Sequence, residues 1–250
     1  MSLSREVFVF RDYSKLADFA LGKWREISAD AVKARGRFTV ALSGGKTPSV
    51  FYRRLADESR GSEAWTLTHI FLVDERFVPV DDADSNYRMI RETLLERAGM
   101  PPANVHPIPT NFADAAIAAD LYGKEISSFF ELSEGGLPDF DLIMLGIGED
   151  GHTASLFPGT VSVTETKRLA CPVILGAERH DRITLTLQVI NNARNIIFMA
   201  AGETKAKVLR DVYEGKDGSL PASKVDPQNG GLLFLADAEA GRLLSEIKRH

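Results

Sequence analysis

Short apolar runs alternate along the chain with longer segments that have helical periodicity. The runs are rich in Val, Ile, Leu and Phe, and most are apolar throughout, which is typical of strands covered on both faces. Strands are predicted at residues 7–10, 38–42, 69–73, 142–145, 183–187, 196–200 and 232–235. Helices are predicted at residues 13–34, 48–58, 86–98, 113–132, 205–213 and 238–247.

The order of these elements predicts the fold class. Strands that alternate with helices favour an α/β protein, here a three-layer, Rossmann-like arrangement with a mainly parallel sheet and helices on both faces. Residues 98–111 and 213–231 are rich in Pro, Gly, Asn and Asp and are predicted to be surface loops. Because helix and strand patterns resume on either side of each loop, residues 1–250 are expected to form a single α/β domain.

The net charge of the chain argues against nucleic acid and acidic membranes as partners. Thirty Lys and Arg residues against thirty-five Asp and Glu residues give a formal net charge of -5, so no overall positive field attracts nucleic acid or an acidic membrane. Neither a secretory signal nor a run of eighteen apolar residues appears, which predicts a cytoplasmic protein that does not span a membrane. Any anionic ligand must be held by a local cluster.

Cys171 is the only cysteine. An intrachain disulfide and a cysteine zinc site are therefore not available. The apolar neighbours in "LACPVIL" predict that Cys171 is a small buried side chain.

Glycines and charged residues recur where predicted strands end. Four predicted strands lead directly into residues 43–48, 74–76, 146–152 and 202–205. In an open parallel sheet the carboxyl ends of the strands form the crevice in which ligands bind. The four segments are therefore expected to line one pocket.

The segment "SGGKTP", residues 43–48, has the features of a phosphate cradle. Its glycines allow close approach of the backbone, Thr47 can cap the following helix, and Pro48 suits the first helical turn. Free N–H groups at such a helix end would face an anion. It is not a Walker A loop, because Val40 stands where that motif needs its first glycine, which disfavours ATP or GTP chemistry. A plain strand-to-helix turn is the alternative interpretation.

Two basic residues add to this segment. Lys205 begins a predicted helix after another strand, and Arg182 opens the predicted strand "RITLTL". Each one alone is typical of a solvated surface charge. Their coincidence with the predicted crevice favours an anion site that two fixed cations complete.

Residues 146–151 match the dinucleotide fingerprint G-x-G-x-x-G, but their context does not fit it. The Pro-Gly pair at 158–159 would end any following helix within about two turns, and no strand ending in an acid follows. We interpret the glycines instead as a tight turn that presents Glu149, Asp150 and His152 at the mouth of the crevice. Two carboxylates beside an imidazole suit a histidine base, although a lone histidine is more often structural.

Two other chemistries lack the spacing that they need. No other histidine forms an i, i+4 pair or a comparable metal-binding spacing with His152, so no metal is expected. Ser43 precedes two glycines after a strand, but the chain has no G-x-S-x-G motif and Ser43 has no deducible histidine partner. Covalent serine catalysis is therefore not favoured.

Five motifs occur in the order and spacing of the 6-phosphogluconolactonases, and the chain resembles this family over residues 7–245. The motifs are "ALSGGKTP", "VDERFVPVDDADSNYRMI", "LGIGEDGHTASLFPG", "RITLTL" and "AGETKAKVL". The family shares its fold with glucosamine-6-phosphate deaminase and ribose-5-phosphate isomerase. The resemblance implies hydrolysis of 6-phospho-D-glucono-1,5-lactone to 6-phosphogluconate, the second step of the oxidative pentose phosphate pathway, without a cofactor.

The resemblance also implies roles for individual residues. His152 would activate water for attack on the lactone carbonyl, and Asp150 or Glu149 would orient it. Asp74 would position water or sugar hydroxyls, and backbone N–H groups of the glycine turns would stabilise the oxyanion. The residues implied to bind the substrate are Ser43, Gly44, Gly45, Lys46, Thr47, Arg76, Gly148, Arg182 and Lys205, with Gly44, Gly45, Thr47, Arg182 and Lys205 around the phosphate.

Two alternatives stay open. A deaminase or isomerase on the same fold uses an acid at the position of Asp74 as its base, but its segment typically reads Asp-Glu-Tyr and this chain has Asp-Glu-Arg. A non-catalytic sugar-phosphate sensor would normally carry a DNA-binding module, whereas one α/β unit with a net negative charge accounts for this chain. A monomer or a small homo-oligomer is expected, with the sugar-phosphate lactone as its partner and no nucleic acid.

Overall fold

The computed structural model describes residues 5–176, 179–245 and 248–249. Within these residues the main sheet has eight strands in the order β11-β1-β10-β9-β6-β2-β3-β5, and neighbouring strands run parallel. The predicted α/β fold with a mainly parallel sheet is confirmed. The bounds are β1 Arg5–Phe10, β2 Phe38–Leu42, β3 Thr68–Leu72, β5 Val105–His106, β6 Leu142–Leu145, β9 Asn195–Ala200, β10 Gly231–Asp237 and β11 Lys248–Arg249.

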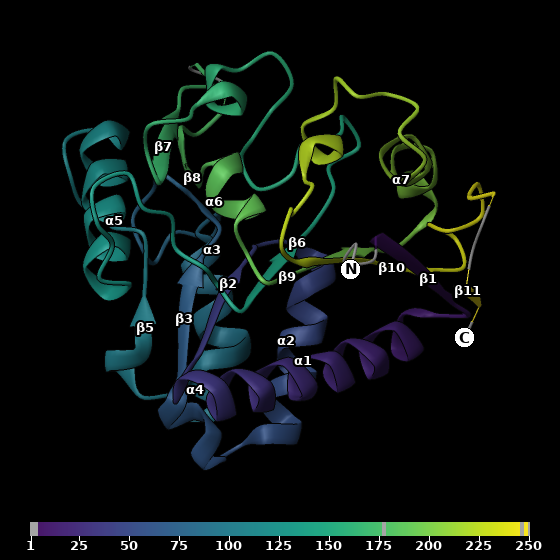
Figure 1. Cartoon of the computed structure of the whole chain (residues 1–250), viewed down its shortest axis with the longest axis horizontal. Helices are drawn as coiled ribbons and strands as arrows, with labels where there is room; N and C mark the ends of the chain where they lie inside the picture. The colour runs from purple at the N-terminus through teal and green to yellow at the C-terminus, as the bar shows by residue number, and fades with distance from the viewer. Residues whose placement is uncertain (1–4, 177–178, 246–247, 250) are drawn as a thin grey trace.

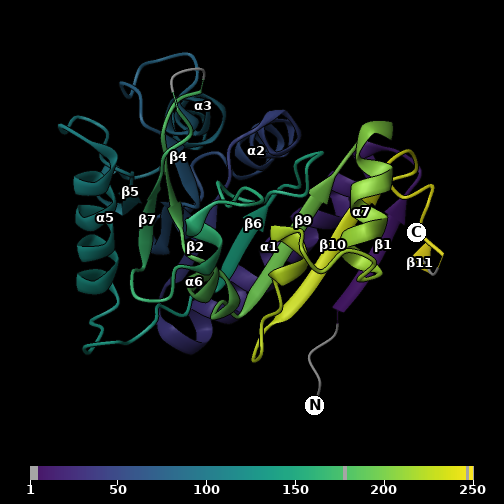
Figure 2. The ribbon, with the colours of Figure 1, turned by 90° about the horizontal axis from the view of Figure 1, so that it is seen from above.

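Helices cover both faces of the sheet (Figure 1). Helices α1 (Tyr13–Arg35) and α2 (Lys46–Ser59) lie on one face, and α6 (Leu187–Asn191) and α7 (Ala206–Tyr213) lie on the other, as the turned view also shows (Figure 2). Strands β2 and β6 are buried along their whole length, which accounts for their continuous apolar runs.

The amino-acid sequence explains where α1, the longest described helix, begins and ends. Asp12 precedes α1 and accepts a hydrogen bond from the N–H of Lys15 at 2.9 Å, and Gly36 ends the helix in the left-handed conformation. Buried residues between these caps, among them Leu16 and Trp24, face the sheet. The prediction for this helix was therefore correct to within one residue.

A second, antiparallel sheet lies beside the main one and was not predicted. It consists of β4 (Asp74–Arg76), β8 (Arg182–Leu185) and β7 (Ala170–Val173). The chain passes between the sheets at Val73, whose N–H donates to Leu42 at 2.9 Å and whose carbonyl accepts from Leu185 at 2.8 Å. Helix α5 (Ala115–Phe129) packs against β7 and β8.

This sheet corrects the prediction of a strand at residues 183–187. The strand ends at Leu185 and α6 begins at Leu187, because the chain turns away after pairing with β4 and β7. The predicted helix at 86–98 is also divided, into α3 (Asn86–Ile90), a π-helical turn (Arg91–Leu95) and α4 (Glu96–Ala98).

The helix predicted at residues 238–247 is wrong over its described part. Residues 238–243 form turns, and 246–247 lie outside the described residues. The carboxylate of Asp237 accepts the N–H of Ala240 at 2.8 Å, and a side chain at Gly241 would collide with Val9. This close packing against β1 fixes a turn in place of a helix.

The two predicted surface loops are more ordered than expected. Residues 105–106 pair with β3 as the edge strand β5. In the second loop, the 3₁₀ turn Pro221–Lys224 carries the buried Ala222, whose N–H donates to Gly151 at 3.0 Å. This loop therefore supports the turn that carries His152. Among the described helices, none has the length and apolar character needed to cross a bilayer.

Candidate active site

A pocket of about 550 Å³ opens at the carboxyl ends of β2, β3, β6 and β9. The structure brings together all four segments that the sequence placed after strands. The residues that line it are Ser43, Gly44, Gly45, Lys46, Thr47, Pro48, Asp74, Arg76, Asn86, Gly146, Ile147, Gly148, His152, Ala154, Ser155, Phe157, Arg179, Arg182, Met199, Ala200, Ala201 and Lys205.

The lining is strongly positive although the chain as a whole is negative. Among the described residues of the lining, the basic side chains are those of Lys46, Arg76, Arg179, Arg182 and Lys205, and the one carboxylate is that of Asp74. Such a local excess of cations in a concave surface favours an anionic ligand.

The segment after β2 leads into α2 at the floor of the pocket. Helix α2 begins at Lys46 after Gly45, and no side chain of the described residues caps its N-terminus. The prediction that Thr47 caps this helix is wrong, because the helix begins one residue earlier and Thr47 lies in its first turn. Pro48 also lies in that first turn, as predicted. Open N–H groups at the start of a fourteen-residue helix suit an anion.

Ser43 and Gly44 are fixed by their surroundings. The hydroxyl of Ser43 donates to the carbonyl of Met144 at 2.8 Å. This hydrogen bond joins the end of β2 to β6 and engages the hydroxyl hydrogen. A Cβ atom at Gly44 would lie 1.8 Å from the side-chain oxygen of Asn86. Glycine is therefore required here, because Asn86 packs directly on the backbone.

The glycine turn after β6 holds His152 against Asp150. The turn closes through hydrogen bonds from the N–H of Gly148 to His152 at 2.8 Å and from the N–H of Gly151 to Gly148 at 3.0 Å. A Cβ atom at Gly148 would lie 2.0 Å from Nδ1 of His152. Residues 146–160 contain turns and no helix, which agrees with our rejection of the dinucleotide interpretation.

Asp150 lies behind His152 and outside the lining of the pocket. Its Oδ1 is 2.5 Å from Nδ1 of His152 and 3.2 Å from the backbone nitrogen of the same residue. Burial raises the pKa of Asp150, but the hydrogen bonds from His152 outweigh it and hold this pKa below its ordinary value. The carboxylate is therefore ionised and can only accept, so Nδ1 carries the hydrogen.

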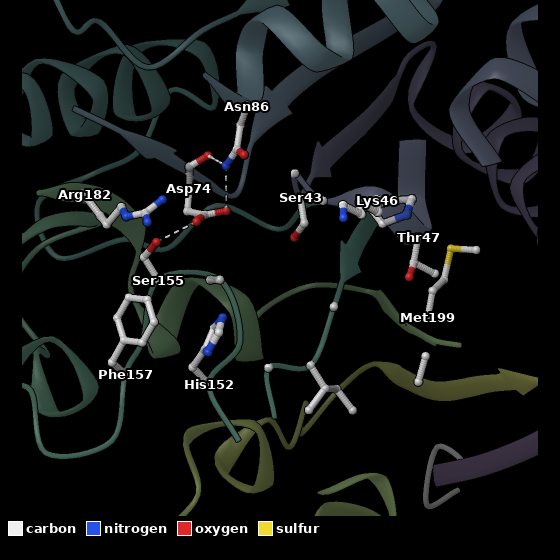
Figure 3. A pocket seen from close by; sticks show the side chains of 18 of the residues that line it. Ser43, Lys46, Thr47, Asp74, Asn86, His152, Ser155, Phe157, Arg182 and Met199 are labelled. Atoms are coloured by element: carbon white, nitrogen blue, oxygen red, sulfur yellow. Dashed lines mark hydrogen bonds between the residues drawn. The ribbon is translucent and has the colours of Figure 1, made fainter. Parts of the chain in front are cut away.

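The imidazole of His152 points into the pocket from this turn (Figure 3). With hydrogen on Nδ1, the neutral ring presents Nε2 as an acceptor. Phe157 packs against the ring with a centroid distance of 4.5 Å, and the guanidinium of Arg179 lies 4.5 Å above the ring of Phe157. Glu149, the other candidate partner of His152, is exposed.

Asp74 is buried at the start of β4 and faces the same pocket (Figure 3). Its Oδ2 accepts from the hydroxyl of Ser155 at 2.6 Å, and its Oδ1 is 3.4 Å from the side-chain nitrogen of Asn86. The same nitrogen donates to the carbonyl of Asp74 at 2.9 Å. The carboxylate is therefore held from two sides.

Glu75 points away from the pocket and organises α3. It accepts the N–H groups of Asn86 and Tyr87, each at 2.7 Å, and the hydroxyl of Ser85 at 3.0 Å. Burial raises the pKa of Glu75, and these donors offset part of the rise. By fixing the start of α3, Glu75 places Asn86 beside Asp74.

Arg76 and Arg182 face each other across β4 and β8. Burial lowers the pKa of Arg182, and the like charge of Arg76 lowers it further. Among the described residues, the buried Nε of Arg182 has no hydrogen-bond partner. An anion in the pocket would offset the repulsion between the two guanidinium groups. It would also give the N–H at Nε of Arg182 a hydrogen-bond acceptor.

The guanidinium of Arg76 donates to the backbone carbonyl of Asp84. Lys205 lies in the 3₁₀ turn Glu203–Lys205 just before α7, as its position after a strand predicted.

The lining includes residues that the sequence did not single out, namely Asn86, Ser155, Phe157 and Arg179. The first three lie within motifs that carried the family resemblance, and this was the one available signal. Cys171 is buried as predicted, and burial raises its pKa to about 12. In the part of the chain that the structure describes, no three His, Cys, Asp or Glu side chains converge as metal ligands.

The chain is similar in sequence to known sugar-phosphate enzymes. The family model described as glucosamine-6-phosphate isomerases/6-phosphogluconolactonase matches residues 11–234. A 6-phosphogluconolactonase of Synechocystis sp. is 42% identical over 86% of this chain and 88% of its own length.

Solved structures agree with this comparison. That of 6-phosphogluconolactonase from Trypanosoma brucei has a TM-score of 0.85 and 31% identity, and covers 98% of this chain and 100% of its own. A monomeric glucosamine-6-phosphate deaminase shares the fold, with a TM-score of 0.77 and 22% identity over 95% of this chain and 99% of its own.

Proposed function

Because the chain belongs to the glucosamine-6-phosphate isomerase/6-phosphogluconolactonase family and is a lactone-hydrolysing enzyme, we propose that His152 activates the water that opens the lactone. The substrate is 6-phospho-D-glucono-1,5-lactone and the product 6-phospho-D-gluconate, and the reaction is the second step of the oxidative pentose phosphate pathway. The observation that carries this proposal is the contact of His152 with the ionised Asp150 beside a pocket rich in cations.

The phosphate end and the lactone end of the substrate bind to different residues of the pocket. The phosphate lies among the start of α2, with Gly44, Gly45 and Thr47, and the cations Arg182 and Lys205. The unpartnered Nε of Arg182 and the uncapped helix N-terminus support this placement, since each gains a partner from an anion. Arg76 contacts the lactone end through guanidinium N–H groups beyond the one bound to Asp84.

Hydrolysis proceeds by proton transfer through His152. Nε2 takes a proton from water as the water oxygen forms a bond to the lactone carbonyl carbon. The tetrahedral oxyanion then collapses, the bond from that carbon to the ring oxygen breaks, and Nε2 returns the proton to that oxygen. Asp150 keeps Nδ1 protonated and stabilises the imidazolium that forms between these steps.

The oxyanion is stabilised by hydrogen-bond donors other than the N–H of Gly148. The N–H of Gly148 is engaged with the carbonyl of His152, so this residue contributes space for the imidazole. We assign the oxyanion to the guanidinium of Arg76, which lines the pocket and carries a full charge.

No observation favours the isomerase or deaminase alternative. The segment that begins at Asp74 reads Asp-Glu-Arg, whereas the deaminase segment typically reads Asp-Glu-Tyr. The deaminase that shares the fold is 22% identical to this chain, whereas the Synechocystis lactonase is 42% identical.

A lactonase assay with freshly generated 6-phosphogluconolactone tests the proposal. The spontaneous rate is measured in buffer at the same pH and subtracted, because the lactone also hydrolyses without enzyme. We expect a rate well above this blank and no turnover of glucosamine 6-phosphate. A rate equal to the blank would reject the proposed function.

A further inference from the structure

Ser155 lies where the turn that carries His152 meets the second sheet. It is buried, with 1% exposure, three residues after His152. Its hydroxyl donates to Oδ2 of Asp74 at 2.6 Å, and its N–H donates to the hydroxyl of Thr184 at 3.2 Å. Asp74 and Thr184 are directly opposite each other on β4 and β8. One serine therefore contacts both members of a cross-strand pair, and Figure 3 shows its contact with Asp74.

The contact with Asp74 is of the strong, charge-assisted kind. An O–H donor to a carboxylate typically lies about 2.5 to 2.7 Å from its acceptor, and this one is at 2.6 Å. Asn86 approaches the other oxygen of the carboxylate. Together they fix the rotation of a carboxylate that is almost fully buried, and the charge itself remains available to the pocket.

We infer that Ser155 is a positioning residue for lactone hydrolysis, acting through Asp74. It fixes the carboxylate that we place against water or the sugar hydroxyls. It also ties the loop of His152 to the strand of Asp74, and so keeps the two groups at a constant separation. The inference rests on the proposed function, because the effect that it assigns to Ser155 is an effect on that reaction.

A double-mutant cycle between Ser155→Ala and Asp74→Asn tests this role. Ser155→Ala should lower kcat/KM about ten- to hundredfold, mostly through kcat, as expected for loss of a hydrogen bond to a charged group. In the Asp74→Asn background the same change should cost less than about threefold, because the partner through which Ser155 acts has already changed.

Two further variants separate the hydrogen bond from packing. Ser155→Cys fills nearly the same space but donates only weakly, so it should lose activity as the alanine variant does. Ser162→Ala is the matched control, because Ser162 is equally buried, its hydroxyl contacts Thr160 at 2.8 Å, and it does not line the pocket. It should keep the wild-type kcat.

The outcomes are distinct. Losses that multiply in the double variant, a cysteine variant with the wild-type rate, or an equal loss in Ser162→Ala would each overturn the role of Ser155 while leaving the lactonase in place. A wild-type rate equal to the buffer blank would reject the proposed function, and this inference with it.

Discussion

At the scale of single residues, one oxygen atom of Asp150 fixes the orientation of the His152 imidazole. Oδ1 accepts both the ring Nδ1–H and the backbone N–H of His152. An asparagine offers an oxygen at the same place but lacks the charge, whereas an alanine offers neither. The two substitutions therefore separate orientation from charge.

Asp150→Asn should lower kcat about tenfold, the usual difference between a charge-assisted and a neutral hydrogen bond. Asp150→Ala should lower it about a hundredfold or more, because the imidazole also loses its alignment. Blank-corrected initial rates at saturating lactone measure both changes. An alanine variant at least as active as the asparagine variant would contradict the aligning role.

Lys205→Ala and Arg182→Ala should chiefly damage recognition of the phosphate. A charge-assisted contact contributes about 1.5 to 3 kcal/mol, so each change should lower kcat/KM about ten- to hundredfold. Unphosphorylated gluconolactone should be far less sensitive to either change.

The matched control is Lys207→Ala, since Lys207 is exposed, pairs with Asp211 and does not line the pocket. It should leave kcat/KM for both lactones unchanged. Equal losses on the two lactones in the Lys205 or Arg182 variant would refute the phosphate role.

The sequence could single out residues whose local pattern is distinctive, such as His152 in its glycine turn and Lys46 before Thr47-Pro48. It could not find residues whose role depends on a distant partner. Ser155 meets Asp74 across 81 positions of the chain, and Asn86 meets Gly44 only because Glu75 fixes the start of α3. No local pattern encodes such contacts.

At the scale of elements, two of the strands that were missed, β4 and β5, are short and lack apolar periodicity. Strand β7 (Ala170–Val173) was also missed, although it is apolar. Strand β4 reads Asp-Glu-Arg and β5 has two residues, so each exists only through its pairing with another strand. The apolar strands β2 and β6 were predicted at their observed bounds, because burial on both faces leaves a continuous signal.

The edge formed by β3 and β5 carries a histidine pair away from the pocket. Nδ1 of His69 lies 3.2 Å from Nε2 of His106, whose Nδ1 contacts Glu125 at 2.8 Å. Burial, His106 and the nearby Arg37 lower the pKa of His69 to about 4. The folded state therefore binds a proton at His69 less readily than the unfolded state, whose histidine titrates near its ordinary pKa of about 6.5.

The stability that the neutral His69 contributes is present above about pH 6.5 and is lost as the pH falls toward 4. Urea unfolding followed across this range should show the decline, and His69→Gln should flatten it. His180→Gln, which changes an exposed histidine paired with Asp84, is the control and should leave the decline intact. A decline of the same steepness in His69→Gln would contradict this assignment.

At the scale of the whole molecule, a chain with a net charge of -5 concentrates basic side chains in one pocket. A ligand that binds only the folded state stabilises it by mass action. The cytoplasmic location, the single domain and the monomer or small oligomer predicted from the sequence stay predictions.

6-Phosphogluconate at about a hundred times its Kd should raise Tm by roughly 5 to 10 °C, from about 2.7 kcal/mol of linkage in a domain of this size. Gluconate without the phosphate should raise Tm much less, and Lys205→Ala should remove most of the shift. Thermal unfolding with and without each compound measures this. Equal shifts with both compounds would contradict a phosphate-binding pocket.

The most direct test of the central claim compares kcat of the wild type with that of His152→Gln on fresh 6-phosphogluconolactone, with the blank subtracted. Glutamine keeps the polarity and approximate size of the side chain but cannot act as a base. We predict a loss of about 10²- to 10⁴-fold, the usual contribution of general acid and base catalysis, with unchanged circular dichroism and Tm. A folded glutamine variant with the wild-type kcat would contradict the account.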